Sequence, residues 1–237
     1  MTHVTVHLWR VHASRVPLAI ARMGLDRQLL RGVDGLRFRK LLGTGDGRTF
    51  SPRDADLRTW GLLCAWDSRA DSLSFEGHAT PRGWRRIASQ EWRADLATLR
   101  TKGRWSGRQP FTVRDDLADW DGPVAAITRA RLKPSLTPTF WRAVPPVVAD
   151  LDTHDGLEAR VGIGEAPLGL QGTLTVWQDA AALTRFAYRH PAHRQAITDT
   201  GRLGWYAEEL FARFAVLQTR GTLFGDPTVG LTGVNGA

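Results

Sequence analysis

The 237-residue chain contains one cysteine, two methionines and only three lysines. A single cysteine excludes an intrachain disulfide, and its place in the apolar segment WGLLCAW (60–66) predicts a buried structural thiol, as in a protein of a reducing compartment. There is no run of eighteen apolar residues, so no transmembrane segment is expected. The first eleven residues lack the basic and then apolar build of a signal peptide, and we therefore expect a cytoplasmic protein.

Because lysine is scarce, the formal net charge of +8 comes almost wholly from arginine. The planar guanidinium group favours bidentate contacts with phosphate or carboxylate. The basic residues are dispersed among acidic ones, without a run of five and without a helix-turn-helix, zinc-finger or RNA-binding signature, so we expect no nucleic acid partner. An arginine-rich solvated surface and an anionic ligand remain as the two explanations.

Common cofactor and metal signatures are also missing. The glycine-rich stretch GTGDG (43–47) is not followed by GK[ST] or directly by a helix, which favours a turn over a phosphate-binding loop. There is no HExxH motif and no cysteine pair, so a structural zinc site is not expected. The chain has no flavin or nicotinamide fingerprint, and electrons for any redox reaction would have to come from a separate electron-donor protein.

Aromatic residues are abundant by contrast, with ten tryptophans, some of which we expect to line a pocket or an interface. The segment 186–214 contains two histidines, four arginines and six aromatic residues. We predict that it is helical, with Asp179 as its cap, and that it faces a ligand. His190 lies near the helix start beside Pro191, whereas His193 lies one turn inside. One inward histidine among aromatic side chains is typical of a heme iron ligand, but a hydrogen-bonded structural histidine gives the same pattern.

An internal repeat determines the expected fold. ATLRTKGRWSG (97–107) matches AVLQTRGTLFG (215–225) at a separation of 118 residues, and Gly43-x-Gly45 recurs as Gly162-x-Gly164. Trp66 and Phe75 recur as Trp177 and Phe186. Each half then reads strand, helix, strand, strand, helix, strand, the order of the ferredoxin-like unit. We therefore predict an α+β protein in which tandem ferredoxin-like repeats form a dimeric α/β-barrel-type fold within one chain.

The pattern also predicts the domain limits and the elements. The first repeat spans 1–110, a polar connection follows at 107–122, the second repeat spans 123–225, and 226–237 form a flexible tail. We expect strands at 4–11, 36–42, 59–66, 123–133, 157–164, 172–177 and 215–225. The expected helices are 16–30, an interrupted helix near 81–83 that leads into 91–105, then 137–151 and 186–214.

Six long passages resemble the spheroidene monooxygenase family of carotenoid ketolase-type oxygenases, over nearly the whole chain. They are RKLLGTGDGRTFSP, RWSGRQPF, AAITRARLKPSLTPTFWRAVP, VGIGEAP, TVWQDAAALTRFAYRHPAHRQAI and GWYAEELFARFAVLQTRGTLFG. The resemblance implies a dimeric α/β-barrel fold and a heme b cofactor in the second repeat. It also implies that the histidine at position 193, rather than His190, is the metal ligand.

The same resemblance places four further residues at family motif positions. Lys40 and Trp205 are interpreted as cofactor-binding, beside His193, and Arg129 and Arg213 as catalytic residues near the heme propionates or the reacting oxygen. Arg129 is expected on a strand and Arg213 on the last helix. A surface ion pair is the alternative role for either arginine, and core packing is the alternative for Trp205.

These observations together favour a heme-dependent monooxygenase that acts on an apolar or secondary-metabolite small molecule. One alternative keeps the heme and changes the chemistry, to an aldoxime-dehydratase-like or N–O/N–N bond-forming reaction. The other is a heme-free binding protein on the same fold. The sequence leaves the substrate, the electron donor and assembly into a homo-oligomer open, because fold and cofactor do not determine the reaction.

Overall fold

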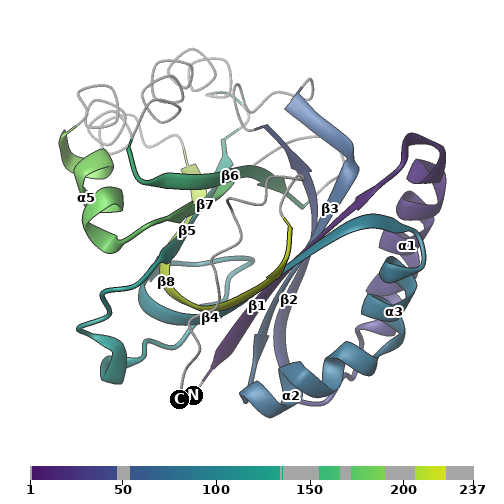
Figure 1. The fold of residues 1–237 in the computed structure, drawn as a ribbon, viewed down its shortest axis with the longest axis horizontal. Helices are drawn as coiled ribbons and strands as arrows, with labels where there is room; N and C mark the ends of the chain where they lie inside the picture. Colours follow the sequence, from purple (N-terminus) through teal and green to yellow (C-terminus); the bar gives the residue numbers. More distant parts are fainter. Residues whose placement is uncertain are drawn as a thin grey trace.

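The computed structural model describes residues 2–46, 54–133, 135, 155–165, 172–189 and 206–222. Within these ranges, eight antiparallel strands close into a barrel in the order β1-β3-β2-β6-β7-β5-β8-β4 (Figure 1). The strands are β1 (His3–Val11), β2 (Leu36–Gly45), β3 (Ala55–Trp66), β4 (Ala88–Gly103), β5 (Val124–Leu132), β6 (Leu157–Gly164), β7 (Gly172–Trp177) and β8 (Tyr206–Gly221). The α-helices are α1 (Val16–Leu29), α2 (Arg69–Ser74), α3 (Ala79–Arg85) and α5 (Ala180–Arg189).

The barrel consists of two ferredoxin-like halves, which confirms the predicted fold class. Strands β1 to β4 lie in the order β4-β1-β3-β2, and β5 to β8 repeat it as β8-β5-β7-β6. The halves join at two seams, β4 with β8 and β2 with β6. Ala97 pairs with Ala215 at the first seam, and Gly43 pairs with Gly164 at the second. The repeated motifs of the sequence therefore meet each other at the seams.

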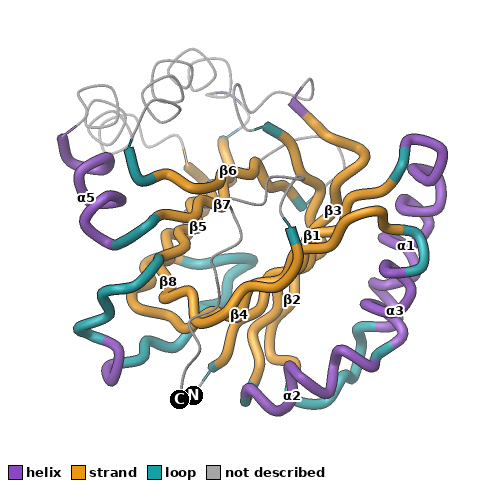
Figure 2. The backbone as a smooth tube through the Cα atoms, viewed as in Figure 1, coloured by secondary structure: helices purple, strands orange, loops and turns teal. Residues whose placement is uncertain are grey.

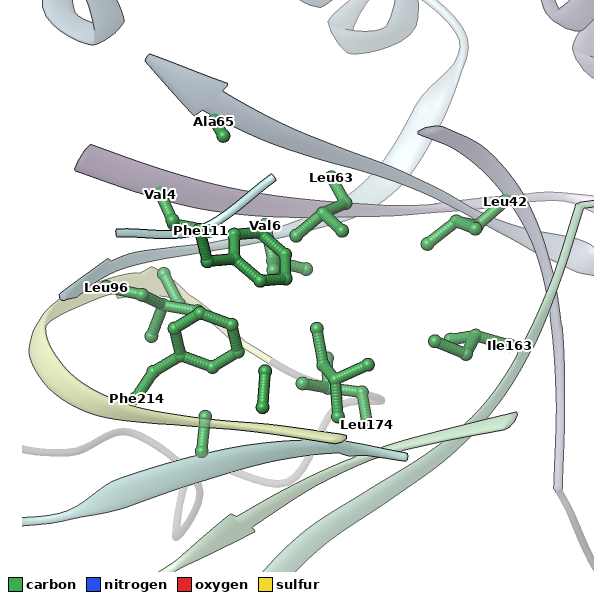
Figure 3. Packing of buried hydrophobic residues seen from close by; sticks show 14 of the residues in the cluster. Val4, Val6, Leu42, Leu63, Ala65, Leu96, Phe111, Ile163, Leu174 and Phe214 are labelled. Carbon is green, nitrogen blue, oxygen red and sulfur yellow. The ribbon is translucent and has the colours of Figure 1, made fainter. Parts of the chain in front are cut away.

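The interior of the barrel is a packed apolar core. Side chains alternate between the two faces of each strand, so that Val4, Val6 and Leu8 of β1 point inward with every second residue of the other strands. Figure 3 shows Val4 and Val6 packed with residues of the other strands, such as Leu96 and Phe214, in the interior of the barrel. Phe214 of β8 packs edge-to-face against Phe111 with the ring centroids 5.0 Å apart. Burying a side chain of this size contributes about 2 to 3 kcal/mol to stability.

A second core lies outside the barrel, between the first half-sheet and helices α1 to α3, which cover that side of the molecule (Figures 1 and 2). Trp9 stacks on Trp84 with their ring centroids 5.2 Å apart, and Trp60 lies beside the pair. The Trp84 indole N–H donates to Asp26 over 2.8 Å. The tryptophans of this half are thus used as packing.

On the opposite side of the barrel, α5 covers part of the second half-sheet. Phe186 of α5 packs on Trp177 of β7, with 5.5 Å between the ring centroids. The two form a small cluster with Val124 and Ala182. The helix predicted at 137–151 lies outside the described residues. Among the described residues, no helix is both long enough and apolar enough to cross a bilayer.

Two predicted helices are corrected by the structure. The predicted helix over 186–214 ends at Arg189 in the described residues, and 206–221 form strand β8, so Arg213 lies on a strand. The segment predicted to lead from helix into 91–105 is strand β4. Both segments are rich in Ala, Leu, Glu and Arg, which favour helix locally, but pairing with neighbouring strands on both sides outweighs that preference.

Candidate functional site

An ion-pair cluster closes one end of the barrel interior. Arg129 of β5 continues the inward row of Ala125 and Ile127, and its guanidinium group is almost fully buried. It donates to Glu165, just after β6, over 2.8 Å, and to Glu208 of β8. Three strands of the second half are thereby joined by one side chain.

Lys40 of β2 enters the same cluster from the first half. Its Nζ donates to Glu165 Oε2 over 2.5 Å and to Ser106 Oγ over 2.6 Å. The indole N–H of Trp105 donates to the other oxygen of Glu165 over 2.7 Å. The Trp105 ring also lies 5.6 Å from both Lys40 Nζ and the Arg129 guanidinium carbon, a cation–π distance.

Glu208 holds the turn that follows β4. Its two carboxylate oxygens accept the backbone N–H groups of Ser106, over 3.0 Å, and Gly107, over 2.7 Å. Ser106 has a φ of 53°, which a non-glycine residue adopts only where its surroundings enforce it. The carboxylate of Glu208 and the ammonium group of Lys40 together supply that constraint.

Both carboxyl groups of the cluster stay ionised. Burial opposes ionisation of Glu165, but hydrogen bonds from Lys40 and Trp105 and the charges of Lys40 and Arg129 outweigh it, so the pKa of Glu165 lies below its ordinary value. The pKa of Glu208 is lowered in the same way, since burial is outweighed by the two backbone N–H groups and by Arg129. The cluster is therefore neutral, with two cations and two anions.

The free space at the cluster is small. The side chains of Trp105, Arg129 and Glu165, together with Leu42, Ile163 and Gly164, leave essentially no volume that a water-sized molecule could occupy. Sites for cofactors and drug-sized ligands usually measure about 300 to 1,000 Å³. This end of the barrel is thus a side-chain plug, and a flat macrocycle does not fit there.

The outer face of the second half-sheet differs from the plug in shape and composition. In the first half, the corresponding face carries Trp9, Leu62 and Cys64, all buried beneath the helices. The strand registers place small residues at the equivalent positions of the second half, namely Ala130 for Trp9, Thr173 for Leu62, Thr175 for Cys64 and Thr128 for His7. At the positions of Trp9, Leu62 and His7 the second half thus has smaller side chains, whereas Thr175 is similar in size to Cys64, and Trp177, Phe186 and Phe211 are bulky residues on the same side.

Arg213 lies on that outer face. It pairs with Ala126 of β5, whereas its neighbours Ala212 and Phe214 belong to the interior core, so the alternation of β8 turns Arg213 outward. Phe211, two residues earlier, is 36% exposed on the same face. Arg160 of β6, which pairs with Thr175, lies on this face as well, and the two guanidinium groups of the face suit a ligand that carries an anionic group.

A buried polar cluster takes the place of Arg213 and Phe211 in the first half. Asp95 of β4 occupies the equivalent of Arg213 and is bonded to His3 and Arg93, each over 2.8 Å. His7, on the adjacent strand, is fully buried, and neither of its ring nitrogens is hydrogen-bonded within the described residues. Burial, reinforced by the charge of Arg93, lowers the pKa of His7 to about 3. His7 is therefore a neutral packing residue, stacked on Trp9.

The five residues predicted for the site fall in three places. Lys40 and Arg129 come together in the plug, where both contact Glu165. Arg213 lies on the opposite face of the same sheet. His193 and Trp205 lie outside the described residues, as does His190.

The sequence reading missed the acidic members of the plug. Glu165 stands in the passage VGIGEAP, but its role depends on Lys40, which is 125 positions away. Glu208 was assigned to a helix. Reading 206–214 with a period of two would have placed Glu208, Leu210, Ala212 and Phe214 on one face, with a single acid at its rim.

Curated relatives agree with the resemblance found in the sequence. The chain is 35% identical to a spheroidene monooxygenase of Rhodobacter capsulatus over 218 residues, which cover 90% of each protein. It is 34% identical to that of Rubrivivax gelatinosus over 195 residues, covering 82% of this chain and 74% of the relative. It is 27% identical to the spheroidene monooxygenase of Cereibacter sphaeroides over 234 residues, covering 97% of this chain and 71% of the relative. No family model matches the chain.

Solved structures show the same fold at low sequence identity. An aldoxime dehydratase is 11% identical with a TM-score of 0.57, covering 91% of this chain and 81% of the other. An aldoxime dehydratase in complex with butyraldoxime is 10% identical with a TM-score of 0.57, covering 91% of this chain and 79% of the other. At such identities the likeness extends to the fold alone.

Proposed function

The chain belongs to the spheroidene monooxygenase family, and on this basis we propose that it is a heme-dependent monooxygenase acting on an apolar, carotenoid-type or other secondary-metabolite molecule. Relatives named as monooxygenases, two of them above 30% identity, support the oxidoreductase class. The cofactor, its ligand and the substrate class are our proposal.

We place the heme against the outer face of the second half-sheet. The observation that carries this assignment is the exchange of Trp9 and Leu62 in the first half for Ala130 and Thr173 in the second. At these two positions the repeated unit has bulky side chains in one copy and small ones in the other. We expect a flat apolar group to be accommodated at these positions in the second copy rather than in the first, where Trp9 and Leu62 occupy them.

His193 is the residue proposed to bind the heme iron, and Trp205 is a proposed contact of the macrocycle. Arg213 supplies a cation on the same face, suited to a propionate or to the polar end of a substrate. When bound, heme would supply oxygen activation for a monooxygenation, in which one oxygen atom would enter a C–H bond of the substrate and the other would leave as water, with uptake of two electrons and two protons. The electrons come from a separate donor protein in this proposal.

Lys40 and Arg129 act from the other face of the sheet. Their inward placement in the plug makes them positioning residues, because they hold β5, β6 and β8 at fixed distances through Glu165 and Glu208. On the outer side, β5 carries Thr128 and Ala130, and β8 carries Arg213. Rigid strands keep that face in register for the ligand.

The decisive test is a heme titration of the purified full-length protein. We expect a Soret band of one-to-one stoichiometry, which His193→Ala abolishes or shifts and His190→Ala leaves unchanged. Loss of the band in His190→Ala alone would transfer the ligand role to that residue. A folded protein that never binds hemin would refute the cofactor assignment, and turnover that survives strict exclusion of oxygen would refute the monooxygenase reaction.

A further inference from the structure

The outward face of α1 is apolar where a surface helix is normally polar. Opposite its buried side, the helix presents Pro17, Leu18, Ala21, Gly24 and Leu25, and all five are exposed. Leu18 is 45% exposed and Leu25 is 49% exposed, and Ile20 at the edge of this face is 50% exposed. Three of the seven large hydrophobic side chains that are exposed in the described residues therefore lie on one helix.

The charges around this face are nearly all positive. Helices α1, α2 and α3 contain only two acids, Asp26 and Asp71, and neither is exposed. Asp34, in the turn after α1, is the nearest exposed acid in sequence. The exposed arginines of the layer, none of which forms an ion pair within the described part of the chain, are Arg15, Arg27, Arg31, Arg69, Arg82 and Arg86.

The helix is held rigidly in this orientation. Asp26, on the buried side of α1, accepts hydrogen bonds from Thr80 Oγ1 over 3.0 Å and from Trp84 over 2.8 Å, both on α3. Arg22 joins the same carboxylate over 2.6 Å and also donates to two backbone carbonyls of α3. Rotation of the leucines into the protein would break this network, so their exposure is built into the fold.

We infer that the α1 face, defined as Pro17, Leu18, Ile20, Ala21, Gly24 and Leu25, docks on the surface of an anionic phospholipid bilayer. Apolar side chains at a helix surface enter the boundary between headgroups and acyl chains, and surrounding cations bind anionic headgroups. A second copy of the chain fits less well, because docking two identical faces would bring the same unpaired arginines together. The inference goes beyond the proposed chemistry, and it would give an enzyme for an apolar substrate access to molecules dissolved in the membrane.

Vesicle flotation of the full-length protein tests this inference. We expect flotation with vesicles of phosphatidylglycerol and phosphatidylcholine, and little with phosphatidylcholine alone. Leu18→Glu/Leu25→Glu is expected to weaken binding by on the order of tenfold or more. Val113→Glu alters a side chain of comparable exposure, 39%, far from α1 in sequence, and is expected to float like the wild type.

A charge variant keeps the test valid if the leucine variant fails to fold. Arg15→Gln/Arg27→Gln/Arg31→Gln leaves the apolar face intact and is expected to lower binding to anionic vesicles, by about fivefold for each arginine at the surface. Absence of flotation at any phosphatidylglycerol content would overturn the inference. A wild-type dimer in sedimentation velocity that Leu18→Glu/Leu25→Glu converts to monomer, without vesicle binding by either, would identify a second copy as the occupant. Neither assay requires heme, so failure here is distinct from failure of the proposed function.

Discussion

Trp9 on β1 and Ala130 on β5 occupy equivalent positions in the two halves of the barrel, since Trp9 pairs with Glu91 of β4 and Ala130 pairs with Glu209 of β8. Both point to the outer face of their half-sheet. The tryptophan is covered by α3 and stacks on Trp84. At the corresponding position the second half has only the small alanine side chain.

Ala130→Trp is expected to block the heme site by placing the residue of the first half into the second. Heme affinity measured from the Soret band should fall by on the order of tenfold or more, because the indole takes the space assigned to the macrocycle. Thr128→Trp, at an exposed position of the same face, gives the same result without overpacking a buried site. Unchanged affinity in both variants would place the heme elsewhere.

Arg129→Met is expected to destabilise the fold by about 3 kcal/mol, because it removes the cation that pairs with Glu165 and Glu208. This value lies near the lower end for breaking a buried ion pair, since both glutamates keep some contact with solvent. Leu8 occupies the equivalent interior position in the first half, so the site accepts an apolar side chain sterically. Urea denaturation measures the change. Arg131→Met, exposed on the same strand, is the control and should alter stability by less than about 0.5 kcal/mol.

We predict that the buried His7 makes the folded protein less stable on mild acidification. Its pKa of about 3 in the folded protein lies below the value of 6.5 for the unfolded chain, so between these pH values the unfolded chain binds a proton that the folded protein does not. Stability therefore falls as the pH falls, by about 1.4 kcal/mol per pH unit within that window. Between pH 7 and pH 5 the wild type should lose about 2 kcal/mol more than His7→Gln. Equal losses in urea denaturation would show that His7 is not the cause.

We predict that two substitutions of Asp26 differ in how strongly they lower the stability of the fold. Asp26→Ala leaves Trp84, Thr80 and Arg22 without their shared acceptor and should cost about 3 kcal/mol. Asp26→Asn keeps one acceptor oxygen and should cost much less, because burial already raises the pKa of Asp26 and disfavours its charge. Thermal unfolding of the two variants measures the difference. Equal destabilisation would mean that the carboxylate charge itself is required.

Much of the fold was readable because the chain repeats itself. The match of 97–107 with 215–225 predicted two ferredoxin-like units, and the structure pairs Ala97 with Ala215 at the seam. Strands with clear alternation or β-branched content, such as 157–164 and 172–177, were predicted with the observed bounds. Segments rich in Ala, Leu, Glu and Arg were predicted as helix, because local preference gives no information about strand partners.

The site was predicted only in part. Lys40, Arg129 and Arg213 stand in recognisable motifs, but their distribution over two faces of one sheet depends on the register of β5 and β8. Glu165 is recognisable as the partner of Lys40 and Arg129 only in the closed barrel, where β2 lies beside β6. The roles of His193 and Trp205 remain predictions.

Three features can be read from the amino-acid sequence alone: two copies of one unit, a core with strand periodicity, and a second copy whose histidine, arginine and aromatic residues differ from those of the first. The tertiary structure decided which residues share a face and which layer is filled. Trp9 and Ala130 are matched only through their strand partners, since the separation between equivalent residues changes from strand to strand with loop length. Burial, charge pairing and the space left for a ligand depend on contacts between distant segments, and the closed barrel creates those contacts.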